Sequence, residues 1–193
     1  LSNGGTQDSW TQCWKNLSVV GSTAGKLIDA NFVPMFSVFD SLFVANDDRS
    51  GTGTAFFVQD AWVSQFSNIY VAGRKDLTAP GYGYGFVYDT NTAAGGNSLL
   101  LNITASYFDE GIVLGHAYDG SKTGFTHIIR STSFVNLQGS YSNVGLHCKQ
   151  GVSYCDIQNY WGEQNQTADI LVDNSAQGLR FFRGNLSSTA IPV

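Results

Sequence analysis

Hydrophobic residues recur along this chain with a regular 26-residue period. A first series with this period consists of Leu17, Phe43 and Ile69. A second series consists of Ile103, Ile129, Cys155 and Phe181. A longer, 34-residue step separates the two series, so one repeat holds about eight extra residues, which we place between 74 and 98. A regular period of this length is typical of a solenoid, in which each coil stacks on the previous one.

Each repeat is expected to contain about three short strands separated by turns. The first set of strands covers 16–19, 68–71 and 102–105, and the second covers 85–88, 111–114, 145–148 and 168–172. The third covers 35–39, 62–66 and 98–101. These segments are too short, and too rich in β-branched and aromatic residues, for helices. Stacked coils can bury the apolar face that one coil cannot.

The pattern therefore predicts an all-β protein, a right-handed single-stranded parallel β-helix of about seven 26-residue coils, with residues 1–193 as one domain. Four further positions share the spacing: Tyr107, Ser133, Asn159 and Asn185. Asparagine at such a coil corner tolerates left-handed backbone angles and can form hydrogen bonds along a ladder. The repeat runs almost to both ends without a polar cap, which a solenoid needs. We therefore expect a fragment of a longer chain, or ends that other chains or domains cover.

Composition excludes several classes of function. Charged residues make up only 13% of the chain and the net charge is −5, without any basic stripe, which argues against binding to nucleic acid. No apolar run approaches the ~20 residues needed to span a bilayer, so membrane insertion is not expected. The three cysteines lack metal-ligand spacing, and no cofactor or metal is implied. We expect Cys148 and Cys155 to be small apolar core residues.

The repeat and one segment resemble a known group of proteins. The segment is 159–165 (Asn-Tyr-Trp-Gly-Glu-Gln-Asn), followed by Asp169 and Ile170. With the glycine-opened strands, it resembles the pectate-lyase-like parallel β-helices, most of all phage tailspikes and related polysaccharide-active proteins. The resemblance covers nearly the whole chain as architecture. It implies a homotrimer at an extracellular or virion surface that binds a bacterial surface polysaccharide, which many of these proteins cleave and others only bind.

Three functions remain open from the sequence. The first is a carbohydrate-recognising β-helix of a tailspike or related virion protein that binds, and in some cases depolymerises, a bacterial surface polysaccharide. The second is a non-catalytic structural shaft or adhesin domain. The third is a secreted polysaccharide lyase or hydrolase. No diagnostic catalytic motif of the resembling group matches this chain.

Glycoside hydrolysis requires two carboxylates, roughly 5 Å apart for retention or ~6.5–9.5 Å apart for inversion. The candidate catalytic residues are Asp109, Glu110, Asp156 and Glu163. Glu110 and Glu163 lie at predicted corners two coils apart, about 10 Å, and could face one site. Each candidate also has a structural interpretation: Asp109 and Glu110 as solvated turn residues, and Glu163 as a cap for backbone amides. Asp156 would then pair with Arg130 on the neighbouring coil.

Candidate substrate-binding residues fall into two kinds, polar and aromatic. Lyase chemistry needs a base and cations beside an acidic sugar, for which Arg130, His147 and Lys149 are available. His147 alternates with inward positions and is expected to point outward, where it could also be plain polar surface.

Sugar recognition uses flat aromatic faces beside hydrogen-bonding groups. The aromatic candidates are Tyr82, Tyr84, Tyr118, Tyr141 and Trp161. Alternatively, these rings cover the core or form an oligomer contact. A further set is expected to be exposed on one chain and buried between subunits: Phe57, Tyr70 and Phe182.

Overall fold

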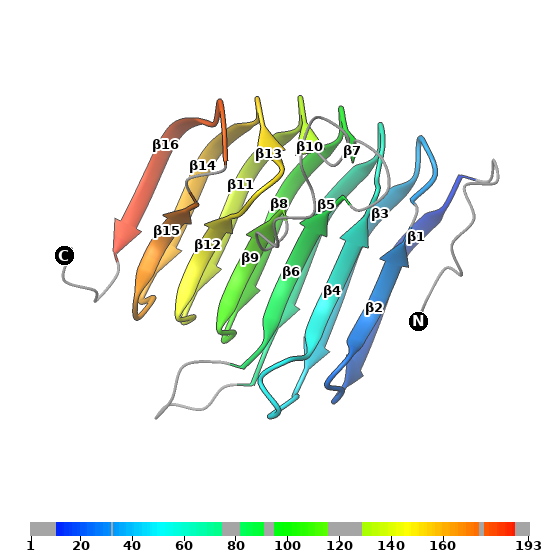
Figure 1. Cartoon of the computed structure of the whole chain (residues 1–193). Helices are drawn as coiled ribbons and strands as arrows, with labels where there is room; N and C mark the ends of the chain where they lie inside the picture. The colour runs from blue at the N-terminus through cyan, green and yellow to red at the C-terminus, as the bar shows by residue number, and fades with distance from the viewer. Residues whose placement is uncertain are drawn as a thin grey trace.

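The computed structural model describes residues 11–31, 33–74, 82–90, 95–115, 129–173 and 176–187. These residues form a parallel β-solenoid of about five turns, built from three parallel sheets (Figure 1). Within the described ranges every regular element is a strand. The predicted all-β parallel β-helix is therefore confirmed, but it has about five turns and not the seven coils that the sequence predicts.

Two large sheets run along opposite sides of the solenoid, and a small third sheet lies along one edge (Figure 1). The seven-stranded sheet contains, in spatial order, β1 (Cys13–Gly21), β3 (Val38–Asn46), β5 (Gln65–Ala72), β8 (Leu99–Ser106), β11 (Ser133–Ser140), β14 (Asp156–Glu163) and β16 (Arg180–Ser187). The six-stranded sheet contains β2 (Lys26–Asn31), β4 (Thr54–Gln59), β6 (Tyr84–Asp89), β9 (Glu110–Leu114), β12 (Val144–Cys148) and β15 (Ala168–Val172). The third sheet contains β7 (Gly95–Gly96), β10 (Ile129–Arg130) and β13 (Val152–Ser153).

The coils differ in length, which corrects the strict 26-residue period. The residues that open successive strands of the seven-stranded sheet pair in the series Cys13, Val38, Gln65, Leu99, Ser133, Asp156 and Arg180. Successive members of this series differ in residue number by 25, 27, 34, 34, 23 and 24. Two coils are long, although the sequence predicts only one insertion. The second insertion lies between β9 and β11.

The variable coil length displaces several predicted neighbours. Leu17 pairs with Leu42, and Phe43 lies on the outer face with 39% of its surface exposed. Val44, which would point outward if Phe43 pointed inward as the 26-residue series predicts, is buried. Ile129, expected beside Ile103, lies in β10 of the third sheet. A constant residue spacing cannot tell which sheet a residue enters once coil lengths vary.

Two of the three predicted sets of strands are confirmed. Ile69 and Ile103 pair in the seven-stranded sheet, and the glycine-opened segments align in the six-stranded sheet, where Ile112 pairs with Leu146. The third predicted set of strands does not form a separate sheet. Its segments belong to the first halves of strands in the seven-stranded sheet, where Phe39 pairs with Phe66. The third sheet of the structure is made by shorter segments.

The core is filled by aromatic side chains from both large sheets. Phe39 and Phe66 stack with ring centroids 4.9 Å apart, and Phe66 meets Phe86 of the six-stranded sheet edge-on at 6.5 Å. Cys148 and Cys155 are buried free thiols, as expected. Burial raises the pKa of these thiols, to about 12 for Cys148 and about 11 for Cys155, so both remain protonated at neutral pH.

Every strand of the seven-stranded sheet contains one residue with left-handed backbone angles. These residues are Asn16, Ser41, Asn68, Asn102, Asn136, Asn159 and Arg183, with φ between 53° and 60°. Asparagine is among the few side chains that tolerate this conformation, which explains why it recurs there. The predicted left-handed asparagine is thus confirmed for Asn159, although it lies within a strand and not at a corner, and is wrong for Asn185, because Arg183 is the left-handed residue of β16.

Four of these asparagines form a hydrogen-bonded row, which we call the asparagine ladder: Asn68, Asn102, Asn136 and Asn159. Each Nδ2 donates to the side-chain oxygen of the preceding coil, at 2.8 Å from Asn102 to Asn68, 2.9 Å from Asn136 to Asn102 and 3.0 Å from Asn159 to Asn136. The ladder ends where Asn68 donates to Asp40 at 2.9 Å. Hydrogen bonds from Ser67 and Asn68 hold the pKa of Asp40 below its ordinary value.

Substitution of Asn102 should separate backbone conformation from side-chain bonding. Asn102→Ala loses the ladder bonds and keeps a Cβ in the left-handed region, where the strain is roughly 1–2 kcal/mol. Asn102→Gly loses the same bonds without that strain. We therefore expect Ala to lower the free energy of unfolding more than Gly, the reverse of the usual order within strands. Urea denaturation of the three proteins measures this, and a glycine variant less stable than the alanine variant would contradict it.

Candidate functional site

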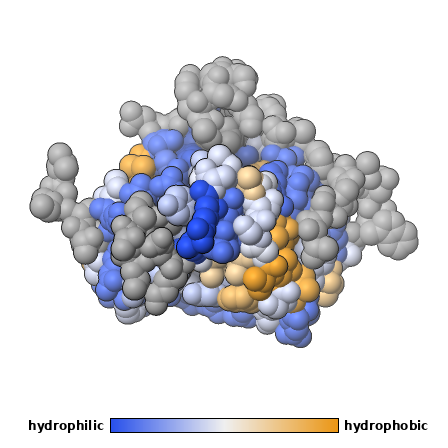
Figure 2. Space-filling view, turned by 90° about the horizontal axis from the view of Figure 1, so that it is seen from below, coloured by the Kyte–Doolittle hydropathy of each residue, from blue (hydrophilic) through white to orange (hydrophobic). Residues whose placement is uncertain are grey.

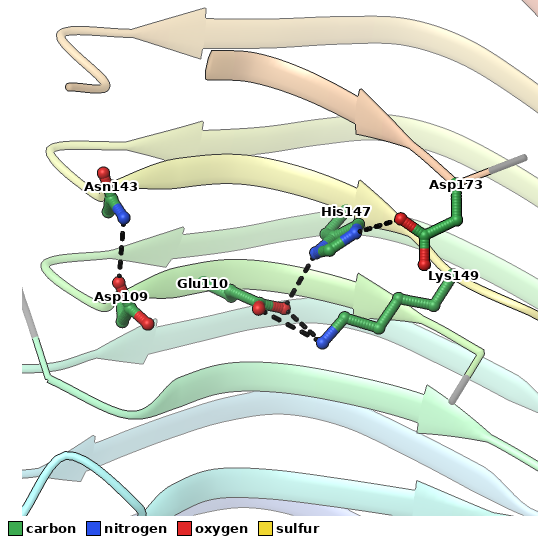
Figure 3. Close-up of polar contacts among 6 residues, drawn as sticks. All are labelled: Asp109, Glu110, Asn143, His147, Lys149 and Asp173. Atoms are coloured by element: carbon green, nitrogen blue, oxygen red, sulfur yellow. Dashed lines mark hydrogen bonds and ion pairs between the residues drawn. The ribbon is translucent and has the colours of Figure 1, made fainter. Parts of the chain in front are cut away.

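Four charged side chains meet on the outer face of the six-stranded sheet (Figure 3). Glu110 opens β9, His147 lies in β12, Lys149 follows β12 and Asp173 follows β15. Because β9, β12 and β15 are neighbours in the sheet, residues distant in sequence lie on adjacent coils. We call Glu110, His147, Lys149 and Asp173 the ionic cluster.

The ionic cluster is continuous from one carboxylate to the other. His147 Nδ1 lies 3.1 Å from Glu110 Oε2, and His147 Nε2 lies 2.9 Å from Asp173 Oδ1. Lys149 Nζ lies 2.8 Å from Glu110 Oε2 and donates to Oε1 at 3.1 Å. The imidazole therefore bridges two carboxylates, and the lysine neutralises one of them.

The cluster lies outside the core but is mostly shielded from solvent. His147 alternates with the core residues Leu146 and Cys148, so its ring lies on the outer face, as the alternation predicts. The exposed fractions of the side chains are nevertheless 11% for His147, 12% for Lys149, 16% for Glu110 and 34% for Asp173. Removing one partner from such a pair leaves a poorly solvated charge behind.

Electrostatics in the cluster favours the charged forms. Burial of His147 opposes protonation, but its contacts with Glu110 and Asp173 outweigh this and raise the pKa of the imidazole. Burial of Glu110 likewise opposes ionisation, yet His147 and Lys149 together hold the pKa of its carboxyl below the usual range. A histidine stabilised as imidazolium is a poor general base. The cluster is thus suited to linking three coils, and its charges balance when His147 is protonated.

The four catalytic candidates are not brought together on one sheet. Glu163 closes β14 in the seven-stranded sheet, whereas Glu110 opens β9 in the six-stranded sheet. The residue of the Glu163 coil that aligns with Glu110 through Val144 is Ala168. Through Ser140, Glu163 aligns with Ser106 at the corner that leads into β9, and the expectation that Glu110 and Glu163 face one site stays a prediction. A catalytic role for either residue stays a prediction.

The other two carboxylates have partners of their own. Asp109 accepts a hydrogen bond from Asn143 Nδ2 at 3.0 Å, in the turn before β9 (Figure 3). Asp156 accepts two hydrogen bonds from Arg180, at 2.6 and 3.0 Å. The predicted pairing of Asp156 with Arg130 is wrong, because Arg130 lies in the third sheet beside Gly96 and Ser153. The regular spacing that suggested this pair spans two different sheets.

The substrate-binding candidates are scattered over the three sheets. Arg130 is exposed in the third sheet. Tyr84 opens β6 and lies under Lys149 Nζ, 5.4 Å from its ring centroid, and Tyr82 is exposed just before it. Tyr118 lies outside the described residues. Trp161 is 49% exposed on the outer face of β14, in the seven-stranded sheet.

A group of aromatic side chains on the seven-stranded sheet was only partly anticipated. Along one row, in spatial order, lie Phe43, Tyr70, Thr104, Gln138 and Trp161. Phe43 and Tyr70 stack with centroids 5.7 Å apart. We call Phe43, Tyr70, Tyr107, Tyr141 and Trp161 the aromatic surface. The sequence marked Tyr70, Tyr141 and Trp161, but only the true register places Phe43 beside Tyr70.

Two further tyrosines of the aromatic surface lie in the turns that follow strands of this sheet. Tyr107 and Tyr141 follow β8 and β11, and their rings stack at 5.1 Å. Tyr107 N donates to Ser140 O, and Tyr141 N donates to Glu163 O, which fixes both residues on successive coils.

Seen from below, the solenoid shows hydrophobic residues gathered beside strongly hydrophilic ones (Figure 2).

The described residues were also compared with the requirements of a metal site and of a membrane-spanning helix. Within those ranges, no three His, Cys, Asp or Glu side chains are placed so that they could hold a metal ion. The same residues include no helix with the length and apolarity needed to cross a membrane.

The ionic cluster should make stability depend on pH from both sides. The contribution of His147 is fully present below its ordinary pKa of 6.5 and is lost as pH rises through its raised folded value. The stabilisation that Glu110 contributes is present above the ordinary carboxyl pKa of 4.5. It is lost as pH falls through the lowered pKa that Glu110 has in the folded protein. Urea denaturation across pH 4 to 9 should show maximal cluster stabilisation between these limits.

A substitution tests the assignment. His147→Gln should lower the free energy of unfolding at pH 6 by about 1–3 kcal/mol, less than for a fully buried pair, and should remove the decline on the alkaline side. Asp156→Asn, which breaks a more exposed pair, is the control and should cost less than about 1 kcal/mol. An unchanged alkaline decline in His147→Gln would assign it to other groups.

Comparison with known proteins adds no family assignment. No family model matches the chain, and no match was found among curated proteins or solved structures. The resemblance to the pectate-lyase-like group is therefore confirmed only at the level of the fold, a parallel β-solenoid.

Proposed function

We propose that this protein is a polysaccharide-binding β-solenoid that acts in attachment at an extracellular or virion surface. The observation that carries the proposal is the aromatic surface on the seven-stranded sheet, where Trp161 is 49% exposed. Flat rings beside hydrogen-bonding groups are the usual means of holding sugars. Exposed aromatic residues gathered on one face of a soluble protein mark an interaction site.

The arrangement favours an extended ligand over a single sugar. Tyr70 and Trp161 lie three strands apart in one row, roughly 14 Å at the usual strand spacing. Thr104 and Gln138 lie between them and offer hydroxyl and amide groups. Since these side chains stand on a hydrogen-bonded sheet, little ordering is required when a ligand binds.

The proposal is for binding without cleavage. Three of the candidate carboxylates already have side-chain partners: Asp109 with Asn143, Glu110 with His147 and Lys149, and Asp156 with Arg180. Hydrolysis needs an acid and a second carboxylate on either side of one glycosidic bond. Glu163 and Glu110 belong to different sheets, an arrangement that favours the proposal of binding without cleavage.

A non-catalytic shaft that assembles as a homotrimer is the second candidate. Tyr70 and Phe182 are exposed, as that hypothesis expects, and Phe182 is 48% exposed. Phe57 fits it less well, because Lys26 Nζ covers its ring at 3.2 Å from the centroid. Sedimentation equilibrium tests this candidate, and a monomer at micromolar concentration would count against it.

Removal of one ring tests the proposed binding surface. Trp161→Ala should weaken binding to a recognised bacterial surface polysaccharide about tenfold, equivalent to ~1.4 kcal/mol. Tyr82→Ala removes an exposed ring beside the six-stranded sheet and should leave affinity unchanged. Affinity electrophoresis in gels that contain extracted surface polysaccharides measures both. The proposed surface is wrong if Trp161→Ala binds like the unaltered protein.

The same samples distinguish binding from depolymerisation. Incubation of the protein with a polysaccharide that it binds should release no new reducing ends and no unsaturated sugars. New reducing ends without unsaturated sugars would point to a hydrolase, whereas absorbance from unsaturated sugars would point to a lyase. Either result would replace the proposal of binding alone.

A further inference from the structure

The charge pattern of the seven-stranded sheet indicates which polysaccharides it can accept. The four central strands, β5, β8, β11 and β14, contain no lysine or arginine. Their only charged side chains are acidic, Asp156 and Glu163, and Asp156 is already paired with Arg180. The cations of this sheet lie on its flanking strands, with Lys15 in β1 and Arg180 and Arg183 in β16. An anionic chain on the central strands would meet no positive charge there, and the cation of the ladder position is Arg183 in β16, at the end of the row.

The asparagine ladder supplies the complementary groups for a neutral chain. An amide side chain has two N–H donors and an oxygen with two lone pairs. In the middle of the ladder, Asn102 donates one N–H to Asn68 and accepts one bond from Asn136. Each such amide keeps one donor and one acceptor beyond the ladder bonds, and the ladder residues are exposed. The result is a row of oriented amides that repeats at the strand spacing of ~4.8 Å.

The ladder and the aromatic row run side by side along the solenoid. In each central strand the second residue after the ladder asparagine belongs to a row that we call the aromatic row, although only its end members are aromatic. Its members are Tyr70, Thr104, Gln138 and Trp161. A chain that lies parallel to the solenoid axis meets both rows over several coils. A chain that crosses the sheet along one strand meets one amide and one member of the aromatic row.

We propose that the seven-stranded sheet takes a neutral polysaccharide, rich in hydroxyl or acetamido groups, with its chain parallel to the solenoid axis along the asparagine ladder. This inference rests on the proposed polysaccharide binding and adds the class and direction of the ligand. Amides donate to and accept from sugar hydroxyls without any charge. The net charge of −5 further disfavours polyanions through general repulsion.

The class of ligand is tested with polymers of known charge. The intact protein is run in native gels that contain a neutral β-glucan, a neutral galactomannan, chitin oligomers or polygalacturonate, each at low and at physiological salt. We expect at least one neutral polymer to retard the protein to the same extent at both salt concentrations. Polygalacturonate should not retard it.

The ladder is tested with variants that keep the backbone conformation. Asn102→Gly together with Asn136→Gly removes two amides but allows the left-handed angles, and should weaken binding to the retarding neutral polymer at least tenfold. Ser41→Gly is the matched control: it has the same position in β3 and a φ of 56°, but lies outside the ladder. It should bind like the unaltered protein. Circular dichroism checks that all variants keep their strands.

The outcomes separate this inference from the proposed function. Salt-sensitive binding to polygalacturonate alone would overturn the neutral class while leaving polysaccharide binding in place. Binding of a neutral polymer that Asn102→Gly and Asn136→Gly do not weaken, but that Trp161→Ala does, would overturn only the role of the ladder. Absence of retardation in every gel, extracted surface polysaccharides included, would overturn both.

Discussion

The register of backbone hydrogen bonds between successive coils is the constraint on which the rest of this structure depends. In a parallel sheet a shift of one residue moves a side chain from the core to the outer face. Phe43 illustrates this, because its pairing with Ser18 places it outside, whereas Leu42 beside it enters the core. Core columns, the asparagine ladder and the aromatic surface are all rows of this single register.

Each strand of the seven-stranded sheet contains one residue with left-handed backbone angles, and this backbone requirement explains the row of asparagines on the outer face. A position that must adopt positive φ favours asparagine, and stacking seven such positions places four asparagines in one hydrogen-bonded row. The same amides support the fold through the ladder bonds and leave polar groups exposed to solvent. A structural solution to strand geometry thus supplies a regular array that an extended polymer could use.

The two large sheets divide the polar chemistry of the protein between them. Charged groups converge on the six-stranded sheet, where Glu110, His147 and Lys149 are largely shielded and form ion pairs with one another. The central strands of the seven-stranded sheet carry amides, hydroxyls and rings, with acidic groups only in β14. Buried charges are costly unless paired, which suits the first group to holding coils together. The second group can contact a ligand without that cost.

The sequence by itself determined the class of fold, since a regular apolar period of this kind can be buried only by stacking coils, and it identified the glycine-opened strands and the buried Cys148 and Cys155. It also predicted that asparagine such as Asn159 would be left-handed. It could not determine the register, because the coils differ in length. The 26-residue period is only their average, and two residues 26 apart need not be paired. Only the tertiary structure therefore decided that Arg130 and Asp156 lie in different sheets, that Glu110 meets His147 across coils, and that Phe43 joins Tyr70. Side chains come together through hydrogen-bonded strand pairing, and variable turn lengths conceal that pairing from residue spacing.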